Sequence, residues 1–297
     1  MSTSYRLGVD LGGTKIEAAL LEPSGSLISR IRRPTPTGDY QGTLDCIRDL
    51  VLEIEADHDL KPLPLGIGVP GSPSPASGLM RNANSQCLND KPLQQDLEST
   101  LDRPVRLAND ANCLALSEAV DGAAHEGKVV FGIILGTGVG GGVVVNQQLL
   151  IGHNAIGGEW GHMPLPWPST TESPGRKCYC GRHGCLETWL SGTAVESLAE
   201  EDGLSIGQAT DIASRTDARH LLEDWLDRLA RSIAVVLNIL DPDYIVVGGG
   251  LNRIEAIYTD IPGRLATYAF SDVIRTNIVP AMHGDSSGIR GAARLWP

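Results

Sequence analysis

Short apolar segments separated by turns open this chain, and a longer amphipathic segment follows them. Segments 5–10, 16–21 and 27–33 are bounded by residues typical of turns, so they predict three strands in a meander. Apolar residues then recur every three or four positions over 42–56, which predicts an amphipathic helix.

The same two periods continue to the C-terminal end of the sequence. Further strands are predicted at 65–69, 105–108, 129–135, 143–146 and 244–247. Further helices are predicted at 93–101, 111–120, 222–240 and 288–296. The polar stretch 72–91 is rich in Pro, Asn and Ser and predicts a long loop, and loops of that length in compact domains are usually functional.

Two glycine-rich turns stand in the same setting, one after segment 5–10 and one after 129–135. Each is followed by a returning strand, which indicates a weak internal repeat. Mixed strands and helices with a duplicated opening predict an α/β fold of two lobes and a cleft. The N-terminal lobe is predicted at 1–120, rejoined by a terminal helix at 286–297, and the C-terminal lobe at 121–285.

Composition narrows the class of protein. Of the 297 residues, 41% are hydrophobic and 20% are charged, which is typical of a soluble globular protein. The net charge of −12 would repel nucleic acid and anionic membranes, so neither is expected as a partner. No apolar run approaches the roughly 20 residues that span a bilayer, and no signal peptide is visible, so a cytoplasmic location is expected. Six cysteines in that compartment predict thiols rather than disulfides.

The first glycine-rich turn has the residue types of a phosphate site. Gly12 and Gly13 allow backbone N–H groups to turn toward phosphate oxygens, and Thr14 and Lys15 add side-chain donors. Asp10, just before them, is placed to hold hydrated Mg²⁺, which prefers carboxylate and water. The alternative is a plain hairpin turn.

The second glycine-rich turn carries Gly136, Thr137, Gly138 and Gly140. Because so many glycines weaken a sheet without structural gain, we interpret it as a second phosphate-binding turn. Both turns join strand to strand, so neither is a Walker A motif or a dinucleotide fingerprint.

A third glycine run, Gly248, Gly249 and Gly250, follows the predicted strand 244–247. Such a run lets an adenine and its ribose lie against the backbone. A turn that starts a helix is the equally acceptable alternative.

Asp110 lies where the predicted strand 105–108 gives way to a helix. The helix N-terminus stabilises a carboxylate there. Phosphoryl transfer needs positioning, charge neutralisation and a group that accepts the hydroxyl proton, so Asp110 is a candidate general base. Asp is also a good N-cap, which is the structural alternative.

Three cysteines within eight residues, Cys178, Cys180 and Cys185, are the most specific local signal. Thiols at this spacing suit a tetrahedral metal such as Zn²⁺, which needs a fourth ligand. His162 is the better candidate and His183 the rival, because His183 lies between the thiols. Free reduced thiols are the alternative.

The glycine turns, Asp110 and the cysteine cluster together resemble the ROK family of sugar kinases over nearly the whole chain. Within that family, the sequence is most similar to the bacterial manno(fructo)kinases. The resemblance implies an actin-like, ribonuclease H-like fold with central mixed sheets and an ATP site with Mg²⁺ between the lobes. It also implies a structural Zn²⁺ held by His162, Cys178, Cys180 and Cys185.

The resemblance further implies the residues that bind the sugar. It assigns Asp110 the role of base and Asn109 a contact to a sugar hydroxyl. The remaining sugar contacts that it implies are Glu159, His162 and Glu187, with Gly71 and Asn84 as weaker candidates.

The implied reaction is ATP-dependent phosphorylation of a free hexose at its 6-hydroxyl by a homodimer. D-fructose, with mannose as a further sugar, is expected from the likeness of Lys15, Asn84 and the Trp167 segment to manno(fructo)kinases. A glucokinase or N-acetylglucosamine kinase of the same family is the first alternative. A sugar-responsive transcriptional regulator is the second, disfavoured because about five residues precede the first predicted strand.

Overall fold

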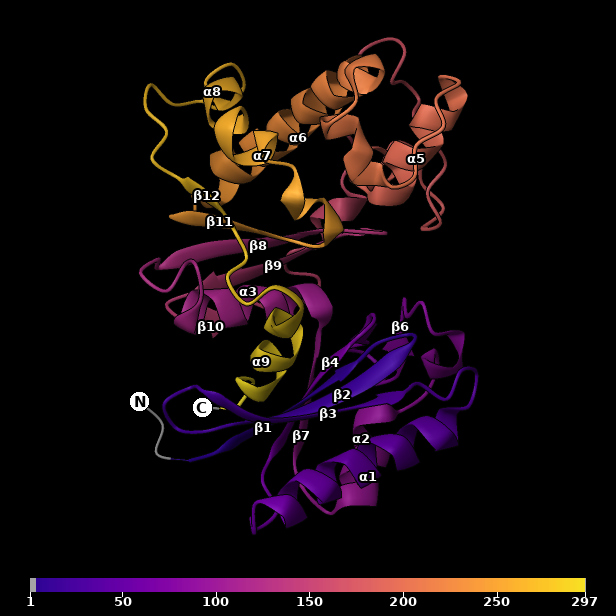
Figure 1. Ribbon diagram of the computed structural model, residues 1–297, viewed down its shortest axis with the longest axis vertical. Coiled ribbons are helices and arrows are strands. Elements are labelled where there is room, and N and C mark those ends of the chain that lie inside the picture. Colours follow the sequence, from indigo (N-terminus) through magenta and orange to yellow (C-terminus); the bar gives the residue numbers. More distant parts are fainter. Residues whose placement is uncertain (1–3, 297) are drawn as a thin grey trace. The chain divides into compact units, whose positions relative to one another are not determined.

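The computed structural model describes residues 4–296. It divides into two compact units. Unit 1 comprises residues 1–121, 151–157 and 285–297, and unit 2 comprises 122–150 and 158–284. Each unit is built on its own five-stranded mixed sheet (Figure 1).

The sheet of unit 1 has the strand order β3-β2-β1-β4-β7. Its strands are β1 (Arg6–Leu11), β2 (Lys15–Leu21), β3 (Leu27–Pro34), β4 (Leu65–Val69) and β7 (Val105–Asn109). The first three form the predicted antiparallel meander, and β4 and β7 continue the sheet parallel to β1. All five strand predictions in this unit are confirmed.

Helices α1 (Tyr40–Asp57) and α2 (Leu93–Leu101) lie on one face of this sheet, and α9 (Ser287–Ala293) lies on the other (Figure 1). The two faces differ because side chains alternate along a strand. Leu7, Val9 and Leu11 belong to the same apolar core as the buried side of α1. On the α9 face small residues replace them: a Cβ on Gly66 would lie 1.9 Å from the carbonyl oxygen of Ala292. Helix α9 therefore approaches the strand backbone closely.

Helix α3 (Asp110–Asp121) follows β7 and packs against α9. The Ser287 hydroxyl donates to the buried Glu118 carboxylate at 2.8 Å, which ties the two helices together. The predicted terminal helix at 288–296 is shorter than expected, because α9 ends at Ala293.

The polar stretch 72–91 is largely irregular, as predicted, but contains three short elements. Strands β5 (Ser72–Pro73) and β6 (Met80–Arg81) pair with each other, and the 3₁₀ turn η1 (Gln86–Leu88) follows.

The sheet of unit 2 repeats this arrangement with the order β10-β9-β8-β11-β12. Its strands are β8 (Val129–Leu135), β9 (Val139–Val145), β10 (Gln148–Leu149), β11 (Tyr244–Gly248) and β12 (Asn277–Pro280). Strands β8, β9 and β10 are antiparallel, and β11 and β12 run parallel to β8. The second glycine-rich turn thus occupies the place in its sheet that the first occupies in unit 1.

The helices of unit 2 pack over this sheet around the long helix α6 (Arg219–Leu240), whose Trp225 is fully buried. The others are α4 (Glu187–Leu190), α5 (Gly192–Glu201), α7 (Ala256–Thr259) and α8 (Ile261–Leu265). Five 3₁₀ turns complete the description: η2 (Trp160–His162), η3 (Ala209–Ala213), η4 (Thr216–Ala218), η5 (Gly250–Arg253) and η6 (Gly284–Ser286). None of the helices described in residues 4–296 has the length and apolar character needed to cross a membrane.

Candidate active site and metal centre

The hairpin between β1 and β2, residues 12–15, is held from outside by Thr35, which directly follows β3. Within the turn, the Gly12 N–H donates to the Lys15 carbonyl at 3.0 Å. The Thr35 hydroxyl donates to the Gly12 carbonyl at 2.7 Å, and the Thr35 N–H donates to the Thr14 carbonyl at 3.0 Å. Two carbonyls of the turn are therefore fixed by one residue.

Asp10 lies one residue before the end of β1, on the face toward α9. A Cβ built on Gly288 would lie 3.6 Å from its carboxylate. Burial, and then the charges of Asp110 and Glu17, raise the pKa of Asp10 to about 6. Burial is the larger cause, and the Asp110 charge contributes because both acids lie at the same edge of the sheet, near the ends of the parallel strands β1 and β7.

Lys15 is partly engaged by an acid of its own strand. Its ammonium lies 3.3 Å from Glu17, whose side chain is almost fully buried. Arg30, at 2.7 Å, and Arg32 also pair with Glu17. Burial alone raises the pKa of Glu17, but the hydrogen bonds from Arg30 and Lys15 outweigh it and lower the pKa. Glu17 therefore stays ionised and holds the Lys15 ammonium at the end of its side chain.

At the start of α3, the adjacent residues Asn109 and Asp110 have different roles. The Asn109 side-chain oxygen accepts from the Asn112 N–H at 2.7 Å, so Asn109 provides the cap. Asp110 is the first helical residue, and its carboxylate accepts from the adjacent Ala111 N–H at 2.8 Å. Because Asn109 caps the helix, the Asp110 carboxylate is not needed as the N-cap.

The environment of Asp110 raises its pKa above the ordinary value. Its side chain keeps exposed surface, but the protein packed around it limits its hydration, and this is the largest cause. The bond from Ala111 N–H acts in the opposite direction. The net upward direction makes the carboxylate a better proton acceptor than an aspartate in water.

Of the two weaker sugar candidates, Asn84 shares a cavity wall with the same hairpin. A cavity of about 440 Å³ has Gly13, Thr14, Thr35 and Asn84 in its wall. Gly71 is not in this wall; it has φ +80° and lies against the backbone of Arg81.

In unit 2, the turn between β8 and β9 comprises Gly136, Thr137 and Gly138. Gly136 N–H donates to the Gly138 carbonyl at 3.0 Å. Its carbonyls are held by the start of α5: Gly192 N–H donates to Gly136 at 2.6 Å, and the Thr193 hydroxyl donates to Thr137 at 3.0 Å. This turn, too, is fixed by residues outside it. Gly140 follows within β9.

Glu187, a predicted sugar contact, binds this hairpin. One carboxylate oxygen accepts from the Val139 N–H at 2.9 Å, and a Cβ on Gly138 would lie 2.7 Å from the same oxygen. Glu187 is half-buried. Glu159, the other acid of this set, is exposed.

A cavity of about 480 Å³ adjoins this hairpin within unit 2. Gly136, Thr137 and Gly250 line it, together with Thr193 and Glu196. Of the third glycine run, only Gly250 reaches the cavity wall. Gly248 ends β11, and Gly249 lies against the backbone of Leu135.

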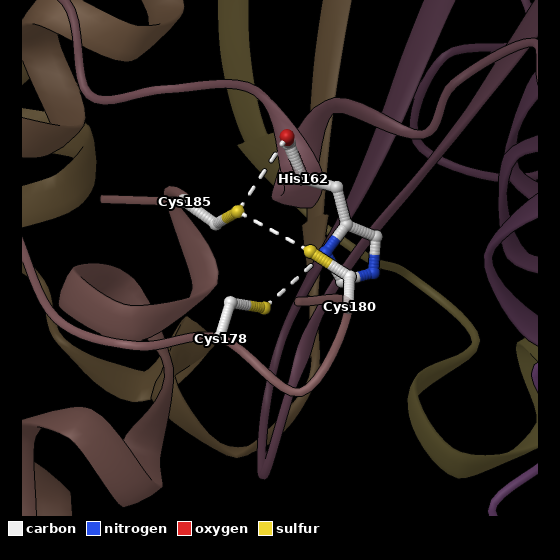
Figure 2. Close-up of side chains that lie close together, drawn as sticks. All are labelled: His162, Cys178, Cys180 and Cys185. Carbon is white, nitrogen blue, oxygen red and sulfur yellow. Dashed lines mark hydrogen bonds between the residues drawn. The ribbon is translucent and has the colours of Figure 1, made fainter. Parts of the chain in front are cut away.

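The predicted metal ligands of unit 2 converge (Figure 2). The ligand atoms of His162, Cys178, Cys180 and Cys185 all lie within 4.8 Å of one another. Cys178 Sγ is 3.6 Å from His162 Nδ1, and the sulfurs of Cys180 and Cys185 are also 3.6 Å apart. His183 is not a member of this group.

These distances fit a tetrahedral zinc. With Zn–S bonds of about 2.3 Å, two thiolates on one ion lie about 3.8 Å apart. Three sulfurs and one imidazole form a closed donor set of the structural type, with no position left for water. The other ring nitrogen, His162 Nε2, lies 3.0 Å from the Tyr179 hydroxyl. With Nδ1 facing the thiols, Nε2 is the nitrogen left for the expected sugar contact of His162, and Tyr179 was not among the predicted residues.

Comparisons with known proteins agree with this fold. The model of the ROK family matches residues 6–297. The chain is 42% identical over 297 residues to an N-acetyl-D-glucosamine kinase of Shigella flexneri serotype 5b (strain 8401), covering 97% of this chain and 98% of the relative.

Two solved structures are similar. A ROK hexokinase from Thermus thermophilus has a TM-score of 0.83 at 28% identity, covering 98% of this chain and 97% of that one. A ROK family glucokinase from Streptomyces griseus, in complex with glucose and AMPPNP, has a TM-score of 0.76 at 26% identity, covering 98% and 99%.

The fold class is therefore the predicted α/β fold of actin-like ATPases, and the class of protein is an ATP-dependent sugar kinase. The chain belongs to the ROK family.

Sequence reasoning missed Thr35, Tyr179, Gly192 and Thr193. Each touches a predicted site residue through a contact between segments separated along the chain. None has a motif, since a threonine after a strand or at a helix start is common. Only strand register and loop packing reveal them.

Proposed function

We propose that this chain transfers the γ-phosphoryl group of ATP to the 6-hydroxyl of a free hexose, with Asp110 as the base. One observation carries the proposal: strands β1 and β7 flank β4 in parallel, so Asp10 near the end of β1 and Asp110 directly after β7 lie at the same edge of the sheet, where β1 leads into the first glycine hairpin. Phosphoryl transfer requires this combination of a proton acceptor, an acid for a cation and N–H donors for phosphate.

Asp110 accepts the proton of the attacking hydroxyl, and Asn109 holds the helix start that presents it. The Asn109 amide NH₂ remains for a sugar hydroxyl, because its oxygen is used in the cap. We assign Asn84 and Gly71 to the sugar as secondary contacts. In unit 2, Glu159, His162 and Glu187 are assigned to the sugar as well.

For the nucleotide, we assign Gly12, Gly13, Thr14 and Lys15 to phosphate binding. Mg²⁺, which neutralises phosphate charge when bound, would be held by Asp10 through water. Gly136, Thr137, Gly138 and Gly140 are assigned to the nucleotide too. The cavity of about 480 Å³ beside them, with Gly250 in its wall, has a size that suits a nucleoside. Gly248 and Gly249 shape the strand end behind it.

We assign a structural Zn²⁺ to His162, Cys178, Cys180 and Cys185. Its role is to stabilise residues 162–185, the segment between the first and last of these ligands. Glu187 follows that segment, two residues after Cys185. The position of these side chains then depends on the metal without the metal taking part in the reaction.

For the acceptor we propose D-fructose, with mannose as a second substrate. Support comes from the likeness of Lys15, Asn84 and the Trp167 segment to manno(fructo)kinases. N-acetyl-D-glucosamine is the second candidate, and its support is the 42% identity to a kinase of that name over nearly the whole chain. Glucose is a third, through the glucokinase structure.

A hexose panel tests the proposal. Purified protein with MgATP is given fructose, mannose, glucose or N-acetylglucosamine, ADP release is followed by a coupled assay, and the phosphorylated carbon is located by NMR. The highest kcat/KM with fructose and phosphate on C6 is the expected result. The highest value with N-acetylglucosamine would replace the sugar but keep the reaction. Sugar binding without phosphorylation of any hexose would favour a sensor and reject the kinase.

We also propose a homodimer, as the resemblance implies. Light scattering coupled to size exclusion tests it, and a mass near 31.5 kDa, that of one chain, would reject it.

A further inference from the structure

We propose that Thr35 is a positioning residue for the phosphate-binding hairpin between β1 and β2. The inference rests on the proposed nucleotide role of that hairpin, but none of the assignments above includes Thr35. It directly follows β3, and it is half-buried.

The first step is the pair of bonds that Thr35 makes. Its hydroxyl donates to the Gly12 carbonyl at 2.7 Å, and its backbone N–H donates to the Thr14 carbonyl at 3.0 Å. The second bond continues the β2–β3 ladder and can be made by most residues. The first needs a hydroxyl, so it depends on the identity of the side chain.

The second step follows from peptide geometry. In a planar trans peptide the C=O of one residue and the N–H of the next point in opposite directions. With the Gly12 carbonyl held toward Thr35, the Gly13 N–H points away from it. Gly12 and Gly13 place little restriction on their own backbone, so an external bond is what selects this orientation. Thr35 thereby pre-sets one donor of the proposed phosphate site.

The third step concerns what surrounds the contact. Thr35, Gly13 and Thr14 all line the cavity of about 440 Å³ in unit 1. Thr37, two residues on, is exposed, and its hydroxyl makes only a long contact of 3.4 Å to the Thr35 carbonyl. The same substitution at Thr37 therefore serves as a matched control in the same loop.

The test compares Thr35→Val, Thr35→Ser and Thr37→Val. Valine keeps the shape of threonine but removes the hydroxyl, whereas serine keeps the hydroxyl. We expect Thr35→Val to raise the KM for ATP and the Kd for MgADP by about tenfold, because the net value of one hydrogen bond is of that order. The KM for the sugar and the melting temperature should change little, and Thr35→Ser should restore nucleotide binding to within about threefold.

Hydrogen exchange of the protein without ligands supplies a second readout. Faster exchange of the Gly13 amide in Thr35→Val, but not in Thr37→Val, is expected. Unchanged nucleotide affinity in Thr35→Val, or equal losses in the Val and Ser variants, would overturn the inference. A parallel rise in both KM values with a lower melting temperature would reduce Thr35 to a structural role. Because MgADP binding is measured directly, failure of all hexoses as substrates would reject the proposed reaction and leave this result interpretable.

Discussion

The two glycine hairpins occupy equivalent places in sheets of the same strand order, yet only one carries charge in its strands. Before the first hairpin stands Asp10, which pairs in register with Glu17. At the corresponding place before the second stands Ile134, which pairs with Gly140. The two sheets share one strand order, but only the hairpin strands of unit 1 carry acidic and basic side chains.

The hairpins also differ in what holds them. Thr35, from the adjacent strand of the meander, fixes the first. The second is fixed by Glu187, Gly192 and Thr193, which lie about fifty residues further along the chain and directly follow Cys185. The first hairpin is therefore held within its own meander, whereas the contacts to the second come from residues that follow the candidate metal site.

The largest expected effect concerns Asp110, in the unit whose hairpin strands carry charged side chains. Asp110→Asn should lower kcat by about 10²–10⁴-fold, because the amide cannot accept the hydroxyl proton. The melting temperature should stay near that of the wild type, since the cap comes from Asn109. Steady-state kinetics and thermal unfolding measure the two quantities. Asp102→Asn is the control, because Asp102 is exposed and asparagine accepts its left-handed backbone. A substantial residual rate in Asp110→Asn would remove it from the role of base.

The next effect tests the dependence of the second hairpin on the candidate metal site. Cys178→Ser should abolish the bound zinc and lower the free energy of unfolding by about 3 kcal/mol or more, because structural zinc contributes ~10–16 kcal/mol of apparent binding energy in peptides. Metal content by mass spectrometry and chemical unfolding measure it. Hydrogen exchange of the Val139 amide should accelerate, since that N–H donates a hydrogen bond to Glu187, while exchange of the Gly13 amide should not change. Cys87→Ser, a half-buried thiol of unit 1, is the control. A zinc-free wild type with the same stability would contradict the assignment.

A smaller effect distinguishes Asp10 from its apolar counterpart Ile134. Burial and neighbouring carboxylates raise the pKa of Asp10 from 3.8 to about 6, so the folded state holds its proton more tightly than the unfolded chain does. The wild type therefore loses stability as pH rises from about 4 to 6. Asp10→Asn removes this loss and should be more stable by about 1–2 kcal/mol at pH 8, with no gain at pH 4, given that one pKa unit is worth about 1.4 kcal/mol and that partial exposure reduces it.

Chemical unfolding at the two pH values, in buffer without Mg²⁺, measures the difference for Asp10→Asn. Asp102→Asn, at the exposed residue that ends α2, is the control. An equal stability difference at pH 4 and pH 8 would refute the raised pKa of Asp10.

The smallest effect tests the hydrogen bond between Glu187 and the second hairpin. In Gly138→Ala the new Cβ would meet the Glu187 carboxylate at 2.7 Å, so the flexible acid must move off the Val139 N–H. We expect a cost of about 1 kcal/mol, the value of one hydrogen bond. Gly136→Ala is the matched control, because its nearest neighbour is the Ile134 side chain at 3.8 Å. Equal losses of stability in both variants would show that Glu187 is not the cause.

What the amino-acid sequence determined by itself was the order of elements and the residue types of the site. Alternating and helical periods are local, so the strands, α1 and α6 were predictable from their apolar positions. The four residues of the candidate metal site were predictable because three lie within eight residues, and the family resemblance selected His162 over His183. The ends of elements were less certain: α9 stops at Ala293 because helix termini depend on tertiary packing.

Only the tertiary structure decided which groups act on one another. Asn109 rather than Asp110 caps α3. The charge of Asp110 contributes to the raised pKa of Asp10. Thr35 and Thr193 each donate a hydrogen bond to a glycine-rich hairpin, although no sequence motif links them to it. These contacts join segments that are far apart along the chain. They are set by strand register and by side-chain packing, which a single sequence does not encode in any local period.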